Sequence, residues 1–252
     1  MDQRLLVYLD KICHSQSIAT LWDIHCGAMQ DFGFDRLIYA FSHFMTPNSF
    51  GPREDFLILY SHPAEYMQRI YQDGQLYEHS PMIEWAAHNY GACSWGWVQQ
   101  NLSRLSPEAR HVLEINSELG VTAGYTISFP ETSSCARGVM ALTARPGLSQ
   151  QDVDQIWTQH GRTIEAMNHV AHLKIMSLPQ QTDRAKLSAR QREALEWVGN
   201  GKTNQDIATI MGVSPATVEK HLRIARAKLG VETTAQAILK ISYLNQIRSP
   251  YG

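Results

Sequence analysis

Residues 187–247 decide the fold of the C-terminal part, and they read LSARQREALEWVGNGKTNQDIATIMGVSPATVEKHLRIARAKLGVETTAQAILKISYLNQI. Polar residues divide this stretch into four short helices. Ser188, Thr203 and Ser214 are each placed to cap the start of a helix, and a proline follows Ser214 at the first helical position. Gly212 supplies a sharp turn between the second and third helices. Two short helices joined by a turn that contains glycine are typical of a helix-turn-helix.

The third helix of this stretch combines an apolar stripe with a cationic face. At 100° per residue the stripe lies on the side of Val218. Its members are Val218, Leu222, Ala225 and Leu229. The opposite side holds Ala216, Lys220, Arg223 and Ala227. Small residues between long cations allow close approach to a major groove, where Lys and Arg reach phosphates or guanine edges. A solvated charged face without a function is the alternative interpretation.

The charge of the chain is unevenly distributed. The formal net charge is −2, but residues 186–252 contain ten Lys and Arg against five acids, a net charge of +5. Residues 1–185 therefore carry −7. A small basic segment attached to a larger acidic one indicates a nucleic-acid module on a sensor or scaffold, because phosphate contacts need cations. Double-stranded DNA is the expected partner.

A long helical pattern and a polar segment separate these two parts. Apolar residues recur at three- and four-residue steps across residues 149–176. The segment 177–186, SLPQQTDRAK, is polar and contains Pro179, so we expect it to end the helix and to act as a linker. The predicted domains are therefore residues 1–176 and 187–248.

The first domain alternates between helical and strand-like patterns. The helical patterns are residues 3–14, 17–31, 63–73, 80–89 and 106–119. The strand-like patterns are residues 36–42, 56–61, 124–129 and 138–144. The last two flank PETSSCA, a loop of turn formers, and should form an antiparallel hairpin. The whole chain is predicted to be α+β: an N-terminal α/β/α sandwich with a mostly antiparallel sheet, followed by an all-α four-helix helix-turn-helix domain.

The sequence disfavours several classes of protein and site. No apolar run approaches the roughly 18 residues of a membrane span, and the N-terminus lacks the features of a secretory signal, so we expect a cytoplasmic protein without a membrane partner. The four cysteines share no close spacing, so we expect free thiols and no metal site. No nucleophile-elbow, zinc-protease or phosphate-loop pattern occurs, which argues against an enzyme and leaves no candidate catalytic residue.

Residues 187–247 resemble the LuxR-type helix-turn-helix domain. The resemblance is carried by LSARQREAL, GKT, IA and SPATVEKHL followed by KL, in the family's order. It implies that Thr217 and Lys220 contact backbone phosphates and that Arg223 reads a base. Glu219 stands where some members have a second base-reading arginine. It can accept from cytosine N4, or it can pair with Arg223 four residues on.

Residues 60–126 resemble the autoinducer-binding domain of quorum-sensing LuxR regulators. The matching stretches are PAEYMQRIY, SPMI, CSW and ELGVTAGYTI. The resemblance implies a pocket between the sheet and the helices for an acylated homoserine lactone or a related small signal, and it implies no further cofactor.

Family positions can be carried onto single residues of this chain. By resemblance, Trp95 matches a tryptophan that packs on the lactone ring, and Tyr71 matches a tyrosine that serves the acyl carbonyl. The tryptophan that donates to the lactone carbonyl is absent. By the family's spacing, counting forward from the preceding proline puts Tyr66 in the place of this tryptophan, whereas counting back from Ser80 puts Met67 there. A one-residue insertion would reconcile the two counts. Ser80 replaces an aspartate that accepts a hydrogen bond from the ligand amide. Because a charge-assisted hydrogen bond is roughly twice as strong as a neutral one, the bond to Ser80 should be the weaker of the two.

The two resemblances together imply a ligand-responsive, DNA-binding transcriptional regulator of the quorum-sensing LuxR type. Homodimer contacts are expected from helices at 149–176 and 235–247, so that two recognition helices meet half-sites about one DNA turn apart. The alternative is an orphan LuxR-type regulator that responds to a non-lactone signal or acts without a ligand. A phosphoreceiver domain is disfavoured, because the first strands lack the acidic pair and the phosphorylatable aspartate that it needs.

Overall fold

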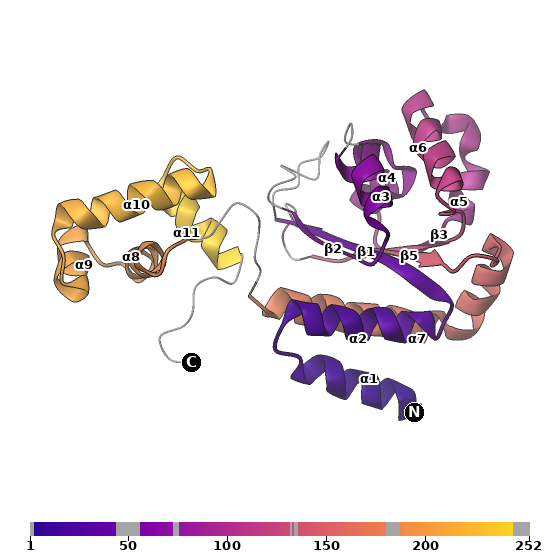
Figure 1. Cartoon of the computed structure of the whole chain (residues 1–252), viewed down its shortest axis with the longest axis horizontal. Coiled ribbons are helices and arrows are strands. Elements are labelled where there is room, and N and C mark those ends of the chain that lie inside the picture. The colour runs from indigo at the N-terminus through magenta and orange to yellow at the C-terminus, as the bar shows by residue number, and fades with distance from the viewer. Residues whose placement is uncertain are drawn as a thin grey trace. The chain divides into compact units, whose positions relative to one another are not determined.

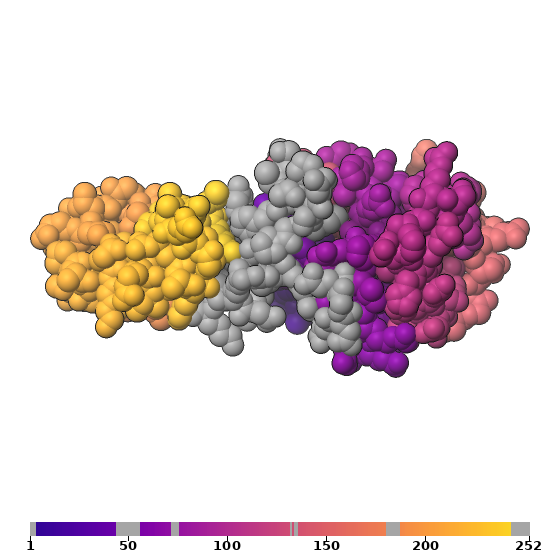
Figure 2. Space-filling model, turned by 90° about the horizontal axis from the view of Figure 1, so that it is seen from above, coloured from indigo at the N-terminus to yellow at the C-terminus, as the bar shows by residue number. Residues whose placement is uncertain are grey.

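The computed structural model describes residues 3–43, 56–72, 76–131, 133, 136–179 and 187–243. The chain forms two compact units, Met1–Ile175 and Met176–Gly252, whose described residues can be followed by their colours in Figure 1 and Figure 2. Most of the expected linker, residues 180–186, and the end of the expected last helix, residues 244–247, lie outside the described residues.

The first unit is built on a five-stranded sheet in which every neighbouring pair is antiparallel. Its strands are β1 (Phe34–Ser42), β2 (Leu57–Tyr60), β3 (Gly91–Ser94), β4 (Gly124–Phe129) and β5 (Arg137–Ala144), in the order β2-β1-β5-β4-β3. The expected hairpin is confirmed, because Phe129 of β4 lies opposite Gly138 of β5. The central strand β5 and its two neighbours, β1 and β4, are mostly buried.

Helices cover both faces of this sheet (Figure 1). One face carries α2 (Ile18–Gln30) and α7 (Gln150–Ser177), and α1 (Gln3–His14) packs outside α2. The other face carries four short helices: α3 (Ala64–Met67), α4 (Pro81–His88), α5 (Gly96–Gln100) and α6 (Pro107–Glu118). The predicted α/β/α sandwich is therefore confirmed.

Several short elements differ from what the sequence predicts. The helix expected over residues 63–73 has only four α-helical residues and continues as a π-helical turn, Gln68–Gln72. Strand β3 (GACS) and helix α5 (GWVQQ) are not predicted, because four or five residues are too few to show a hydrophobic period. Two 3-10 turns, Leu76–His79 and Leu102–Arg104, are missed for the same reason.

Two histidines of the first unit are buried and uncharged. The imidazole of His25 is hydrogen-bonded to the Tyr8 hydroxyl (2.7 Å) and to the side-chain oxygen of Asn168 (3.1 Å). Burial lowers the pKa of His25 to about 4. Burial also lowers the pKa of His62, which lies just before α3, to about 3. Both imidazoles are therefore neutral in the folded protein at neutral pH.

These histidines should make the first unit less stable in mild acid. An unfolded histidine has a pKa of about 6.5, so below that pH the unfolded chain binds protons that the folded chain does not. The free energy of unfolding should fall as the pH is lowered from about 6.5 towards 4. Urea unfolding followed by tryptophan fluorescence measures this dependence. His62→Gln should flatten it, and His14→Gln, at a mostly exposed side chain, is the control. An unchanged slope in His62→Gln would contradict the explanation.

The described part of the second unit forms four short helices around one apolar core. They are α8 (Ala189–Gly199), α9 (Asn204–Met211), α10 (Pro215–Leu229) and α11 (Thr234–Tyr243). The core residues are Leu187, Ala194, Leu195, Ile207, Ala208, Met211, Val218, Leu222, Ala225, Leu229, Ala237 and Ile241. As predicted, Ser188, Thr203 and Ser214 cap helices through their side-chain oxygens, and Gly212 is left-handed with a φ of 66°. None of the described helices has the length and apolar composition that crossing a membrane requires.

Candidate ligand cavity and DNA-binding helix

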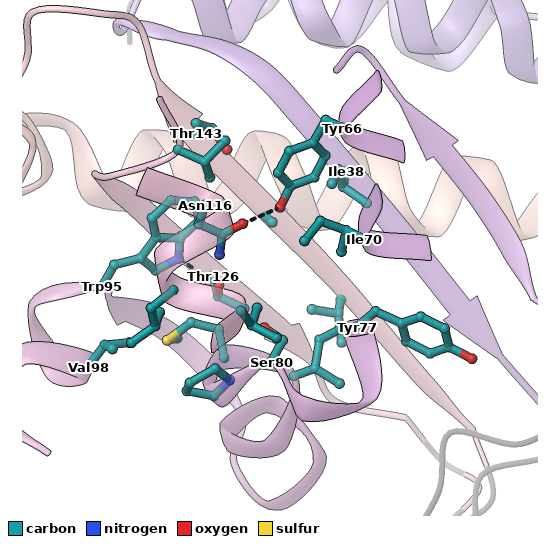
Figure 3. Close-up of a pocket in the computed structure, with 18 of the residues that line it drawn as sticks. Ile38, Tyr66, Ile70, Tyr77, Ser80, Trp95, Val98, Asn116, Thr126 and Thr143 are labelled. Atoms are coloured by element: carbon teal, nitrogen blue, oxygen red, sulfur yellow. Dashed lines mark hydrogen bonds between the residues drawn. The ribbon is translucent and has the colours of Figure 1, made fainter. Parts of the chain in front are cut away.

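A cavity of about 140 Å³ lies in the first unit, between the sheet and the helices α3–α6 (Figure 3). Its mostly apolar wall is formed by strands β1, β4 and β5 and by side chains of those helices. Tyr66, Tyr71, Ser80 and Trp95, four of the five residues expected to bind a ligand, line it. The fifth, Met67, is buried in the hydrophobic cluster beside it but is not part of the wall.

Tyr66 reaches the cavity from α3 and is held from two sides. Its ring packs on the imidazole of His62, with ring centroids 4.3 Å apart. Its hydroxyl donates to Oδ1 of Asn116 on α6 (3.1 Å; Figure 3). Burial raises the pKa of Tyr66, so the phenol stays protonated and keeps this donor. The sequence does not single out Asn116, because it lies inside the helical pattern of residues 106–119 with no motif around it.

A π-helical turn follows α3 and carries the next tyrosine to the cavity. A π-helical turn closes its hydrogen bond over one more residue than an α-helical turn. The turn Gln68–Gln72 follows both Tyr66 and Met67 and contains Tyr71. Tyr66 and Tyr71 both line the cavity.

Tyr71 and Ser80 contribute further polar groups. Tyr71 stacks on Tyr77, with ring centroids 5.3 Å apart and ring planes 9° apart, and burial raises its pKa. Ser80 is the residue before α4, but its side chain makes no capping hydrogen bond to that helix. Ser80 also lines the cavity, and its hydroxyl can either donate or accept a hydrogen bond.

Trp95 follows β3 and forms another part of the wall. Its indole N–H donates to Oγ1 of Thr126 on β4 (2.9 Å; Figure 3), and its backbone N–H donates to the carbonyl of Gly124 (3.1 Å). The ring lies so close to Gly124 that a Cβ there would be 2.9 Å from two of its carbons. The position of Trp95 therefore requires a residue without a side chain at 124.

Hydrogen bonds behind this wall tie it to α7. Oδ1 of Asp154 on α7 accepts from the hydroxyls of Ser94 (2.7 Å) and Tyr125 (2.9 Å). Ser94 and Tyr125 are the chain neighbours of Trp95 and Thr126, which hold the cavity wall together. The edge of the sheet is thus fixed to α7 next to the tryptophan.

Helix α10 of the second unit presents the predicted cationic face. Lys220 and Arg223 are exposed, as are the small residues Ala216 and Ala227. Thr217 is half-buried, and its hydroxyl is hydrogen-bonded to that of Ser214 at the start of the helix (2.9 Å). The arrangement has the small and cationic residues that close approach to DNA requires.

Glu219 does not pair with Arg223, so that expectation is corrected. Its Oε1 accepts from Arg226, seven residues on (2.9 Å), and its Oε2 accepts from Asn204 of α9 (3.3 Å). Arg226 also donates to the hydroxyl of Thr234 at the start of α11 (2.8 Å). Arg226 is the partner because α11 holds its guanidinium beside Glu219. These bonds join three helices and leave Arg223 outside their network.

Two family models match the chain. The model of the autoinducer binding domain matches residues 17–175, and that of the bacterial regulatory proteins of the luxR family matches residues 185–241. The transcriptional activator protein LuxR of Aliivibrio fischeri is 24% identical over 204 residues, which cover 79% of this chain and 78% of that protein.

Solved structures share the arrangement of elements. SdiA of Escherichia coli has a TM-score of 0.54 at 17% identity, covering 98% of each chain. SdiA in complex with octanoyl-rac-glycerol has a TM-score of 0.53 at 17% identity, covering 96% of this chain and 94% of that one. CepR2 of Burkholderia cenocepacia, an N-acylhomoserine lactone dependent factor, has a TM-score of 0.52 at 17% identity, covering 69% of this chain and 94% of that one. At these identities the likeness shows the fold alone.

Proposed function

This chain belongs to the LuxR family of bacterial regulatory proteins with an autoinducer-binding domain, and on that basis we propose that it controls transcription in response to a small signal bound in the cavity. The observation that carries the proposal is the presence, on one chain, of a mostly apolar cavity with a few polar groups and a helix-turn-helix with an exposed cationic face. Small-molecule sites have such walls, and major-groove recognition uses such helices. Regulation, rather than catalysis, is the proposed activity.

The proposed signal is an acyl-homoserine lactone or a related acyl compound. Trp95 packs on its head group, Tyr71 serves the acyl carbonyl, and Tyr66 and Ser80 supply hydroxyls. Their common location on the wall of one cavity supports these roles. The fold of SdiA holds octanoyl-rac-glycerol, which supports the alternative of a non-lactone signal for an orphan regulator.

Replacing Ser80 with aspartate should raise the affinity for an acyl-homoserine lactone about tenfold. A carboxylate would accept from the ligand's amide N–H in a charge-assisted bond, stronger than the neutral one by about 1–2 kcal/mol. Isothermal titration calorimetry with N-octanoyl homoserine lactone measures the change. Octanoyl-rac-glycerol has no N–H and is the control ligand. An equal response to both ligands would show that residue 80 does not lie beside the amide.

Co-purification tests whether a signal is bound at all. The full chain is expressed with candidate extracts and denatured, and the released compounds are identified by mass spectrometry. An acyl compound at about one molecule per chain supports the proposal. A protein that is dimeric and binds DNA without any released compound favours the remaining alternative, action without a ligand.

We propose that DNA is recognised by a cytoplasmic homodimer. In each chain, residues 1–176 are the sensor domain, 177–186 the linker and 187–248 the DNA-binding domain. Thr217 and Lys220 contact phosphates, and Arg223 reads a base. Contacts through α7 and α11 would place two α10 helices at half-sites about one DNA turn apart. Sedimentation of the full chain with ligand and operator DNA tests this, and a monomer under those conditions would rule it out.

A further inference from the structure

The polar side chains that the described residues bring to the cavity wall are all neutral. Among the described lining residues there is no Asp, Glu, Lys, Arg or His, and the polar atoms belong to hydroxyls, an indole and side-chain amides. A charged ligand group buried here would lose its hydration without gaining a counter-charge. A ligand that suits this wall is therefore uncharged where it meets it.

Two of the wall's donors are already used within the protein. The Tyr66 hydroxyl donates to Oδ1 of Asn116, and the Trp95 indole donates to Thr126. The side-chain N–H groups of Asn116 have no hydrogen-bond partner among the described residues, although Asn116 lies on the cavity wall. Figure 3 shows its amide between Tyr66 and Trp95. Because the bond from Tyr66 fixes the amide by its oxygen, the nitrogen is left to donate to whatever occupies the cavity.

We propose that Asn116 determines the specificity of the cavity by donating to an oxygen on an uncharged acyl ligand. This inference rests on the proposed function and names the ligand class. A carbonyl or hydroxyl oxygen satisfies the Asn116 N–H groups, whereas a ligand N–H meets only neutral acceptors here. Neutral acyl esters and lactones therefore suit the cavity, a ligand N–H is not required, and fatty-acid anions are rejected.

Three probes with the same acyl chain test the ligand class on the full chain. They are octanoyl-rac-glycerol, which is neutral and has no N–H, N-octanoyl homoserine lactone, which is neutral and has one, and octanoate, which is an anion. Titration calorimetry should give affinities for the two neutral probes within about fivefold of each other, and an affinity for octanoate at least about a hundredfold weaker. The inference would be overturned if octanoate bound as tightly as the two neutral probes. It would also be overturned if the lactone bound more than about tenfold more tightly than the glycerol ester.

Two variants of similar size test the residue. Asn116→Asp keeps an acceptor for the Tyr66 hydroxyl but removes both N–H donors, and Asn116→Leu removes donors and acceptor together. Both should weaken binding of the neutral probes at least about tenfold. Asn89→Asp, which makes the same chemical change at an exposed residue after α4, should leave binding unchanged. Thermal unfolding of each variant shows whether it is folded, and Asn116→Asp provides the test if Asn116→Leu is not.

The outcomes separate the inference from the proposed function. Neutral probes that bind the native chain and the folded Asn116 variants equally would overturn the role of Asn116 alone. If no acyl probe binds the native chain, the proposed signal-binding function fails, and this inference fails with it.

Discussion

Replacing Arg223 with alanine should lower the affinity of the full chain for its operator between about tenfold and a hundredfold. Arg223 lies in the middle of the exposed face of α10 and outside the Glu219–Arg226 network, so its guanidinium is available to reach a base edge. A bidentate arginine–guanine pair contributes roughly 1–3 kcal/mol of discrimination. The operator is first obtained by selection from random duplexes with the native protein. Fluorescence anisotropy then measures the affinity of native and variant chains.

Substitutions of two other cations distinguish a base contact from a phosphate contact. Lys220→Ala should weaken binding to all duplexes alike and reduce the slope of log affinity against log salt by about one, because a phosphate contact carries no sequence information. Arg190→Ala is the control, since Arg190 lies on α8 and is paired with Glu193. If Arg223→Ala lost affinity equally for operator and random duplex, Arg223 would be a phosphate contact and not a base reader. A native chain whose DNA binding did not weaken with salt would contradict the proposed interface as a whole.

The second unit could be predicted almost element by element because its signals are local. A capping side chain stands at the start of α8, α9 and α10, and the apolar stripe of α10 repeats every three or four residues. The role of Glu219 could not be predicted in the same way. Its partner Arg226 is placed by a hydrogen bond to Thr234 of the next helix, and no spacing within α10 reveals that contact.

The cavity could be predicted only in part, because contacts between distant segments form it. Trp95 and Tyr71 were accessible through resemblance to a family. Asn116 was not, since its significance comes from a bond to Tyr66, fifty residues earlier in the chain. The choice between Tyr66 and Met67 also stayed open at the level of sequence. In the structure Tyr66 lines the cavity and Met67 packs in the hydrophobic cluster beside it, a difference in side-chain direction that the sequence pattern does not show.

Replacing Gly124 with alanine should destabilise the first unit by about 3 kcal/mol, in the upper part of the range for overpacked cores. A Cβ at this position would overlap the backbone oxygen of Leu142 on the neighbouring strand β5, and it would lie 2.9 Å from two ring carbons of Trp95. The tryptophan could turn away, but strand β5 cannot move without breaking its backbone hydrogen bonds to β1 and β4. Because Trp95 lines the cavity, the variant should also lose affinity for the signal.

The matched substitution Gly27→Ala should have the opposite sign. Gly27 lies within helix α2 and is exposed, and a Cβ added there would meet no neighbouring atom within 4 Å. Alanine at this position removes the entropic cost of a helical glycine, so the free energy of unfolding should rise by about 0.5–1 kcal/mol. Urea unfolding of both variants, with the transition of the first unit followed by tryptophan fluorescence, compares the two signs directly. Equal stability of Gly124→Ala and the native chain would mean that β4 and β5 are not packed as closely at Leu142 as the ladder requires.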